Sequence, residues 1–105
     1  MALREPDNAD VHNLLGFSSR NLGRYDLAFT HYRRALALDP RHKGAHEYIG
    51  ETYLKVGDLA SAEKHLAALR ELCPMSCEPL KDLEREIAEF KTKFGDRPLV
   101  PPARK

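Results

Sequence analysis

The 105-residue chain is 42% hydrophobic and 31% charged, which is enough apolar material for one folding unit with a modest core. Its 17 basic and 16 acidic residues are well mixed and give a formal net charge of +1, which argues against nucleic acid as a partner. No apolar run reaches bilayer-spanning length, and the opening stretch MALREPDNAD lacks the basic and apolar regions of a secretory signal. We therefore expect a soluble chain without membrane insertion, cytoplasmic by default, and periplasmic or secreted if a signal lies upstream of Met1.

The stretch from residue 15 to residue 40 recurs 34 residues further along the chain. Residues of the same type stand 34 positions apart in five pairs: Gly16 and Gly50, Gly23 and Gly57, Ala28 and Ala62, Leu38 and Leu72, Pro40 and Pro74. A fixed period in this range is typical of helical hairpins that stack on one another and share a core. Pro6 is in the same register, so we interpret residues 1–8 as the tail of an upstream repeat and the chain as a piece of a longer array.

Helical periodicity divides the rest of the chain into units. Apolar residues recur three and four apart over residues 9–22, 25–38, 43–56, 59–72 and 77–94. We expect one helical hairpin at 9–42, a second at 43–76 and a single capping helix at 77–94, whose charged outer surface suits the end of a solenoid. Residues 95–105 contain Pro98, Pro101 and Pro102 and no periodicity, which predicts a flexible tail; a proline-rich docking segment is the alternative.

The repeat resembles the tetratricopeptide repeat family, in which Leu-Gly, aromatic residues, alanines and a final proline recur within 34 residues. The matching residues are Leu15, Gly16, Ala28, Tyr32, Ala35 and Pro40 in the first unit, and Ile49, Gly50, Tyr53, Ala62 and Pro74 in the second. His12 and His46 stand where the family usually has tryptophan. Residues 42–73 also resemble short bacterial proteins of this family without an assigned partner. The resemblance implies an all-α, right-handed α-solenoid of two tetratricopeptide hairpins plus the capping helix.

The resemblance further implies a concave groove, lined by the first helix of each unit, that binds peptides or protein segments. The candidate groove residues are Asn13, Phe17, Arg20, Asn21, Glu47, Tyr48, Glu51, Lys55, Lys81 and Arg85. Phe17 and Tyr48 are expected as apolar anchors, and the basic residues Arg20, Lys55, Lys81 and Arg85 as orienting charges. Family members that clamp a C-terminal carboxylate use more Lys and Asn residues than this chain offers. Here Lys81 and Arg85 alone match, and Glu47 and Glu51 would repel an anion.

Cys73 and Cys77 lie between the second hairpin and the capping helix. A disulfide and a pair of free, partly buried thiols are both compatible with the sequence. Zinc would need two further ligands, so we expect no metal site. The pairs His12 with His46 and His31 with His65 each stand 34 residues apart, and we interpret all four as packing residues.

The sequence predicts binding and not catalysis. It has no nucleophile with a defensible partner base and no glycine-rich phosphate loop, so we expect neither an enzyme nor a cofactor. The predicted function is a protein–protein interaction module. One alternative is a scaffold that self-associates through an uncapped N-terminal face around Leu3, Val11 and Leu14. A third is a redox- or metal-linked module that uses Cys73 and Cys77.

Overall fold

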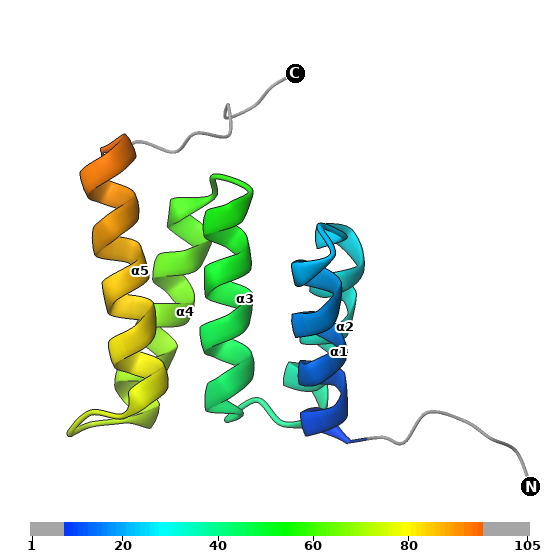
Figure 1. Cartoon of the computed structure of the whole chain (residues 1–105). Coiled ribbons are helices and arrows are strands. Elements are labelled where there is room, and N and C mark those ends of the chain that lie inside the picture. The colour runs from blue at the N-terminus through cyan, green and yellow to red at the C-terminus, as the bar shows by residue number, and fades with distance from the viewer. Residues whose placement is uncertain (1–7, 96–105) are drawn as a thin grey trace, which may run out of the picture.

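Five α-helices make up residues 8–95, the part of the chain that this computed structural model describes (Figure 1). They are α1 (Ala9–Asn21), α2 (Tyr25–Leu38), α3 (Lys43–Lys55), α4 (Leu59–Leu72) and α5 (Glu78–Phe94). Each begins and ends within one residue of the range that the periodicity predicts. The stretches interpreted as an upstream repeat (1–8) and as a proline-rich tail (95–105) lie outside the described residues, apart from Asn8 and Gly95.

Local signals in the sequence set the ends of the helices. The Asn8 side chain accepts hydrogen bonds from the backbone N–H groups of Asp10 and Val11, at 2.8 and 3.2 Å. These bonds satisfy two of the free donors at the start of α1. Gly23 and Gly57 follow α1 and α3 at φ values of +78° and +82°, in the left-handed region that glycine adopts without steric cost. The helices of each hairpin can therefore reverse direction over a short turn.

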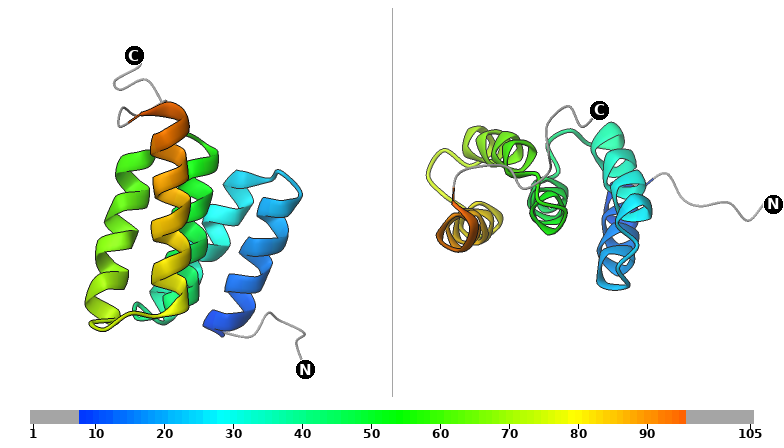
Figure 2. Two further views of the ribbon diagram at one scale, coloured as in Figure 1. Left: turned by 60° about the vertical axis from the view of Figure 1, so that its left-hand side comes forward. Right: turned by 90° about the horizontal axis from the view of Figure 1, so that it is seen from above.

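The helices form two layers (Figure 2). α1 and α2 make one hairpin, α3 and α4 make a second, and α5 packs against both α3 and α4. α1, α3 and α5 lie in one layer, with α2 and α4 behind them (Figures 1 and 2). Residues 8–95 contain no strand, so the chain is an all-α helical solenoid, as the sequence predicts. None of the described helices is both long enough and apolar enough to cross a membrane.

Two apolar clusters hold the layers together. The first joins α2 to α3 through Ala28, Phe29, Tyr32 and Ile49, each at most 8% exposed. The second lies between α4 and α5 and contains Leu59, Ala62, Leu66, Leu69, Cys73, Leu80, Leu83, Ile87 and Phe90. Most of the apolar stripe of the capping helix is thus core, which explains why a helix with so polar an outer surface stays attached.

Gly16 and Gly50 permit close helix contacts, but with different partners. A Cβ added at Gly16 would lie 2.5 Å from the Tyr32 ring of α2, in the same hairpin. A Cβ added at Gly50 would lie 2.8 Å from a methyl group of Leu83 in α5. The sequence predicts that both glycines bring the two helices of a hairpin together. This description fits Gly16, whereas the closest approach at Gly50 is to the capping helix.

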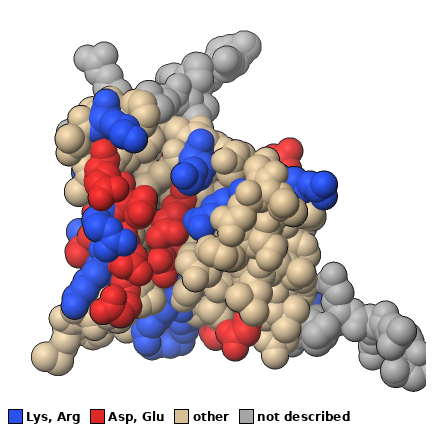
Figure 3. All heavy atoms as spheres, in the orientation of Figure 1, with Lys and Arg blue, Asp and Glu red and all other residues tan. Residues whose placement is uncertain are grey.

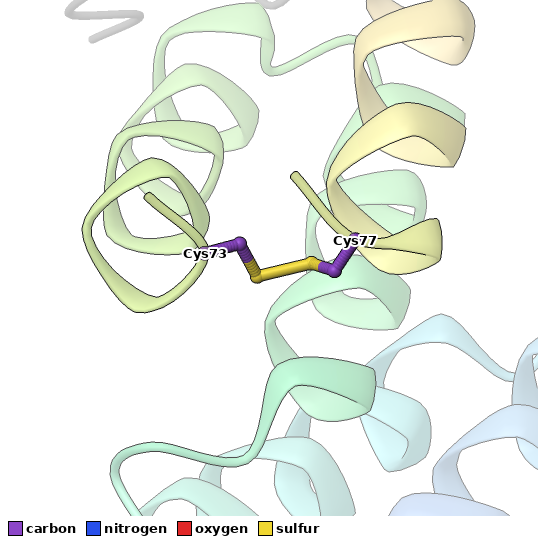
Figure 4. The surroundings of a disulfide bond; sticks show 2 residues. All are labelled: Cys73 and Cys77. Atoms are coloured by element: carbon purple, nitrogen blue, oxygen red, sulfur yellow. A yellow bond between two sulfur atoms is a disulfide. The ribbon is translucent and has the colours of Figure 1, made fainter. Parts of the chain in front are cut away.

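A disulfide and an ion pair fasten α5 to α4. Cys73 at the C-terminal end of α4 is bonded to Cys77 at the start of α5, with Cα atoms 5.9 Å apart (Figure 4). Further along the two helices, Lys91 Nζ lies 2.9 Å from Glu63 Oε2. The cross-link fixes the N-terminal end of α5, and the ion pair lies near its C-terminal end. Of the two readings that the sequence left open, the structure has the disulfide.

Candidate functional site

A groove of about 750 Å³ opens on the layer formed by α1, α3 and α5. Its apolar lining consists of Leu54, Val56, Phe90 and Phe94. Its charged lining consists of Arg20, Glu51, Lys55, Glu86, Glu89 and Lys93. Apart from Arg20, these side chains come from the C-terminal halves of α3 and α5 and from the turn after α3. An apolar lining with polar groups around it is the usual character of a protein site that binds another molecule.

Four of the predicted residues form one contact cluster between α1 and α3. The ring centroids of Phe17 and Tyr48 are 5.0 Å apart, and the Arg20 guanidinium stands 4.9 Å from the Phe17 centroid. Arg20 Nη1 also lies 3.0 Å from Glu51 Oε1, and each of these charged side chains is 14% exposed. The ion pair and the ring contacts hold Arg20 in place. Arg20 therefore joins the two hairpins, and its charge is already paired before any ligand arrives.

Carboxylates gather between α3 and α5, as the space-filling view shows (Figure 3). Burial raises the pKa of Glu47 most, and a hydrogen bond to Glu51 and the negative charges of Glu51 and Asp82 raise it further. Together they move the pKa of Glu47 from 4.5 to about 9. Glu47 is therefore protonated at neutral pH and can donate a hydrogen bond. This acidic seam, defined as Glu47, Glu51 and Asp82, disfavours an anionic ligand and favours a cationic one.

The other predicted groove residues are less involved. Asn21, Lys55 and Lys81 are exposed on the surface, and Lys55 lines the groove. Arg85 Nη1 donates to Asp82 Oδ1 at 3.2 Å, so its charge is also partly neutralised. The two residues that matched a carboxylate clamp, Lys81 and Arg85, do not line the groove of residues 8–95 described above.

Asn13 is buried between α1 and α3, although the sequence places it on the groove surface. Its side chain is 7% exposed, and its amide nitrogen lies 3.1 Å from the position that a Cβ on Gly44 would take. The Asn13 Oδ1 and the Tyr32 hydroxyl are buried atoms without a hydrogen-bond partner among the described residues. Burial raises the pKa of Tyr32 to about 12, so its hydroxyl stays protonated.

Sequence reasoning missed most of the groove that α5 contributes. Phe90 and Phe94 were assigned to the packed stripe of the capping helix, and Glu86, Glu89 and Lys93 to its solvated surface. In the structure Phe94 is 49% exposed and lines the groove with its neighbours. The available signal was the length of the apolar stripe, which runs one helical turn beyond the last fully buried residue of α5.

Each hairpin contains a pair of histidines that touch across its two helices. His12 Nδ1 lies 3.3 Å from His31 Nδ1, and His46 Nδ1 lies 3.0 Å from His65 Nδ1. The Nε2 of His46 lies 2.8 Å from the carbonyl oxygen of Pro40, to which it can donate. The sequence register pairs histidines of successive units, whereas the structure pairs them within one unit. Such contacts are consistent with a packing role, because each pair shares one proton between two ring nitrogens.

No group of three or more His, Cys, Asp or Glu side chains within residues 8–95 is arranged to hold a metal ion. The acidic seam and the histidine pairs are therefore described by their hydrogen bonds and charges alone.

Comparison with known proteins identifies the repeat. Residues 9–42 match the family model described as the tetratricopeptide repeat. This chain is a tetratricopeptide repeat protein. The match covers the α1–α2 hairpin, and in this repeat protein α3 and α4 form the same hairpin again at the same spacing.

A distant relative shares part of the sequence. Over 59 residues the repeat protein is 37% identical to the probable biofilm formation methyltransferase WspC of Pseudomonas putida. The match covers 56% of this chain and 14% of that protein. The chain therefore corresponds to a small part of its relative's length, and the similar segment occurs in a bacterial protein.

Proposed function

We propose that this tetratricopeptide repeat protein binds a segment of another protein in the groove between α3 and α5. Tetratricopeptide repeats generally mediate protein–protein interaction. The observation that best supports a groove ligand here is the groove itself, with an apolar lining of four residues surrounded by charged side chains. A short segment can bury one apolar side chain in such a groove and satisfy its polar groups around it.

The charges around the groove suggest what the bound segment is like. Glu86 and Glu89 stand on the α5 side, and the acidic seam continues toward the other end of the same helix pair. Lys55 and Lys93 add positive charge near the apolar lining. We propose a segment with an apolar residue followed by cationic residues, the apolar one against Phe90 and Phe94. Phe17 and Tyr48 stay the proposed anchors at the α1 side, with Lys55, Lys81 and Arg85 as orienting charges.

The proposed mode of action is binding without catalysis. The family match supports a binding module, whereas the relative's name refers to a methyltransferase. Because the similarity covers 14% of that relative, its activity is not carried over to this chain. The disulfide between Cys73 and Cys77 lies at the opposite end of α5 from the groove, so we give it a structural role in this proposal.

A peptide selection tests the proposal. A random peptide library displayed on phage is selected on the full chain, and the affinity of one selected peptide is then measured by calorimetry. Glu89→Lys and Phe94→Ala in the groove should each weaken binding about tenfold or more, which corresponds to about 1.4 kcal/mol. The matched controls are Glu71→Lys on the exposed side of α4 and Met75→Ala in an exposed loop. Equal losses in both sets, or a library that yields no binder, would sink the assignment.

Self-association stays a second candidate because the first hairpin exposes large apolar side chains. Leu14 of α1 is 61% exposed and Leu22 at its C-terminal end is 70% exposed. Exposed leucines at this density are typical of contact surfaces. Leu3, also assigned to this face by the sequence, lies outside the described residues. Sedimentation across a concentration series distinguishes the candidates: Leu14→Glu should abolish a dimer, and a strict monomer at high concentration removes the candidate.

A further inference from the structure

We infer that residues 96–105 of this same chain occupy the groove between α3 and α5 and compete there with a bound protein segment. The inference rests on the proposed function, because it assigns an internal occupant to the proposed binding groove. Three features carry it: the place where the segment begins, its length, and the match between its residues and the groove.

The segment begins at the edge of the groove. Phe94, the last residue of α5, lines the groove and is 49% exposed. Gly95 follows at φ +81°, a left-handed conformation that ends the helix and turns the chain away from its axis. Residue 96 therefore starts next to the apolar lining, and no long excursion is needed to enter it.

The segment is long enough to run the full length of the groove back along α5. From Phe94 to Glu86 the groove extends about 12 Å at the rise of an α-helix, and Asp82 lies about 20 Å from Gly95. Extended proline-rich chain advances about 3.1 Å per residue. Leu99, four residues after Gly95, can thus reach any part of the apolar lining, and Arg104, nine residues after it, can reach the acidic seam.

The residue order of the segment matches the order of surfaces in the groove. Leu99 and Val100 come first and are flanked by Pro98 and Pro101. They would cover the apolar lining of Leu54, Phe90 and Phe94. Proline residues restrict the free segment, so less conformational entropy is lost when it binds.

The charges of the segment are complementary to those farther along the groove. Residues 96–105 contain three basic residues and one acidic residue, and Arg104 and Lys105 stand at the end. When Leu99 lies on the apolar lining, these two cations come near Glu47, Glu51 and Asp82. A cation placed there offsets the repulsion among the three carboxylates. The apolar and the charged halves of the segment are thus satisfied in a single register.

Nuclear magnetic resonance on the full chain tests the contact directly. We expect nuclear Overhauser effects between the methyl groups of Leu99 or Val100 and the rings of Phe90 or Phe94. In a full chain that carries Leu99→Glu and Val100→Glu, these effects should disappear and the amide signals of Leu54, Glu86 and Phe90 should shift. Met75→Glu, which adds a charge in an exposed loop, should leave these amides unchanged. The absence of the contacts, together with unchanged amides in the double variant, would overturn the inference.

A competition measurement separates this inference from the proposed function. The selected peptide should bind the Leu99→Glu, Val100→Glu variant about threefold more tightly or better, because an internal competitor lowers the apparent affinity of the wild-type chain. If the peptide binds both chains equally and its affinity still falls in Glu89→Lys, the internal occupant is wrong and the proposed function stands. If the contacts to Leu99 are present but no peptide is selected, the internal occupant stands and the proposed function is wrong.

Discussion

Gly16 and Gly50 occupy equivalent positions in the two repeats, yet they face neighbours of different rigidity. The neighbour of Gly16 is the ring of Tyr32, which is fully buried and cannot move aside. The neighbour of Gly50 is the pair of methyl groups on Leu83, which can rotate by small amounts. We predict that Gly16→Ala lowers the free energy of unfolding by about 1–3 kcal/mol, because overpacking outweighs the better helix propensity of alanine. Gly50→Ala should cost less than Gly16→Ala.

Urea denaturation of the two variants checks this order. Ser18→Ala, on the exposed surface of α1, serves as a control for the helix propensity of alanine. A larger loss in Gly50→Ala than in Gly16→Ala would contradict the account of which contact is rigid.

Glu47 should make the fold less stable as the pH rises. Its pKa is raised from 4.5 to about 9, so the folded chain keeps a proton that the unfolded chain releases. Stability contributed by this group is therefore present at pH 4.5 and is lost progressively up to about pH 9. Glu47→Gln keeps the neutral form at every pH, and we expect it to be about 1–2 kcal/mol more stable than the wild type at pH 8.5, with allowance for the solvent that screens a half-buried group. Urea denaturation at pH 5 and pH 8.5 measures the difference, and Glu71→Gln should show no such dependence.

His65 acts in the opposite direction at lower pH. Burial lowers its pKa most, and the neighbouring His46 and Lys64 lower it further, from 6.5 to about 4. The folded chain therefore resists a proton that the unfolded chain accepts, and stability is lost as the pH falls from about 6.5 to 4. Because the Glu47 effect has the opposite sign below pH 6.5, the loss is best observed in a Glu47→Gln background. There, stability should fall by about 1–2 kcal/mol between pH 7 and pH 4, allowing for partial exposure. Adding His65→Asn should flatten the curve, and an unchanged slope would count against the shared-proton contact with His46.

At the level of single helices, the disulfide determines how firmly α5 is held. Cys73 and Cys77 are four residues apart, so the cross-link closes a very short loop. By loop-closure entropy such a link contributes about 2 kcal/mol. We predict that a reducing agent, or the double variant Cys73→Ser with Cys77→Ser, lowers the free energy of unfolding by about that amount.

Hydrogen exchange shows whether the loss is local. Amides in the first turns of α5 should exchange faster after reduction, while those of α1 and α2 should change little. Identical stability with and without reductant would mean that the disulfide does not constrain α5, and it would leave the redox-linked alternative without a mechanism.

The sequence predicted the helices well because their signals are local. Apolar spacing, the Asn8 cap and the turn glycines Gly23 and Gly57 each act within a few residues, so they can be read without knowing the fold. Contacts between helices are different in kind. The Arg20–Glu51 ion pair crosses from α1 to α3, and the contact of Gly50 crosses to α5. Neither partner is specified by spacing along the chain.

The same reason explains why the groove was only partly predicted. Helical phase and the family resemblance placed Arg20, Glu51 and Lys55 on the groove face, and these three residues line it. The α5 side was missed because an apolar stripe in a terminal helix is compatible both with core and with an exposed surface. Phe90 belongs to the core and the groove at once, and Phe94 to the groove edge. Only the position of α5 against α3 separates these roles.

At the scale of the whole molecule, the groove requires all three helices of one layer. α3 and α5 supply its walls, and Arg20 of α1 closes one edge through its ion pair with Glu51. The two hairpins and the capping helix therefore have to be assembled before the groove exists. A ligand of the groove should accordingly stabilise the complete chain against unfolding, by mass action on the folded state.

Chemical-shift mapping of the full chain with a selected peptide tests the central claim most directly. The account predicts that the largest amide shifts fall on α3 and α5 around Glu51, Leu54, Glu86 and Phe90, and that the exposed sides of α2 and α4 change little. Shifts confined to α2 and α4, or to the exposed leucines of the first hairpin, would contradict the proposal that this groove is the binding site.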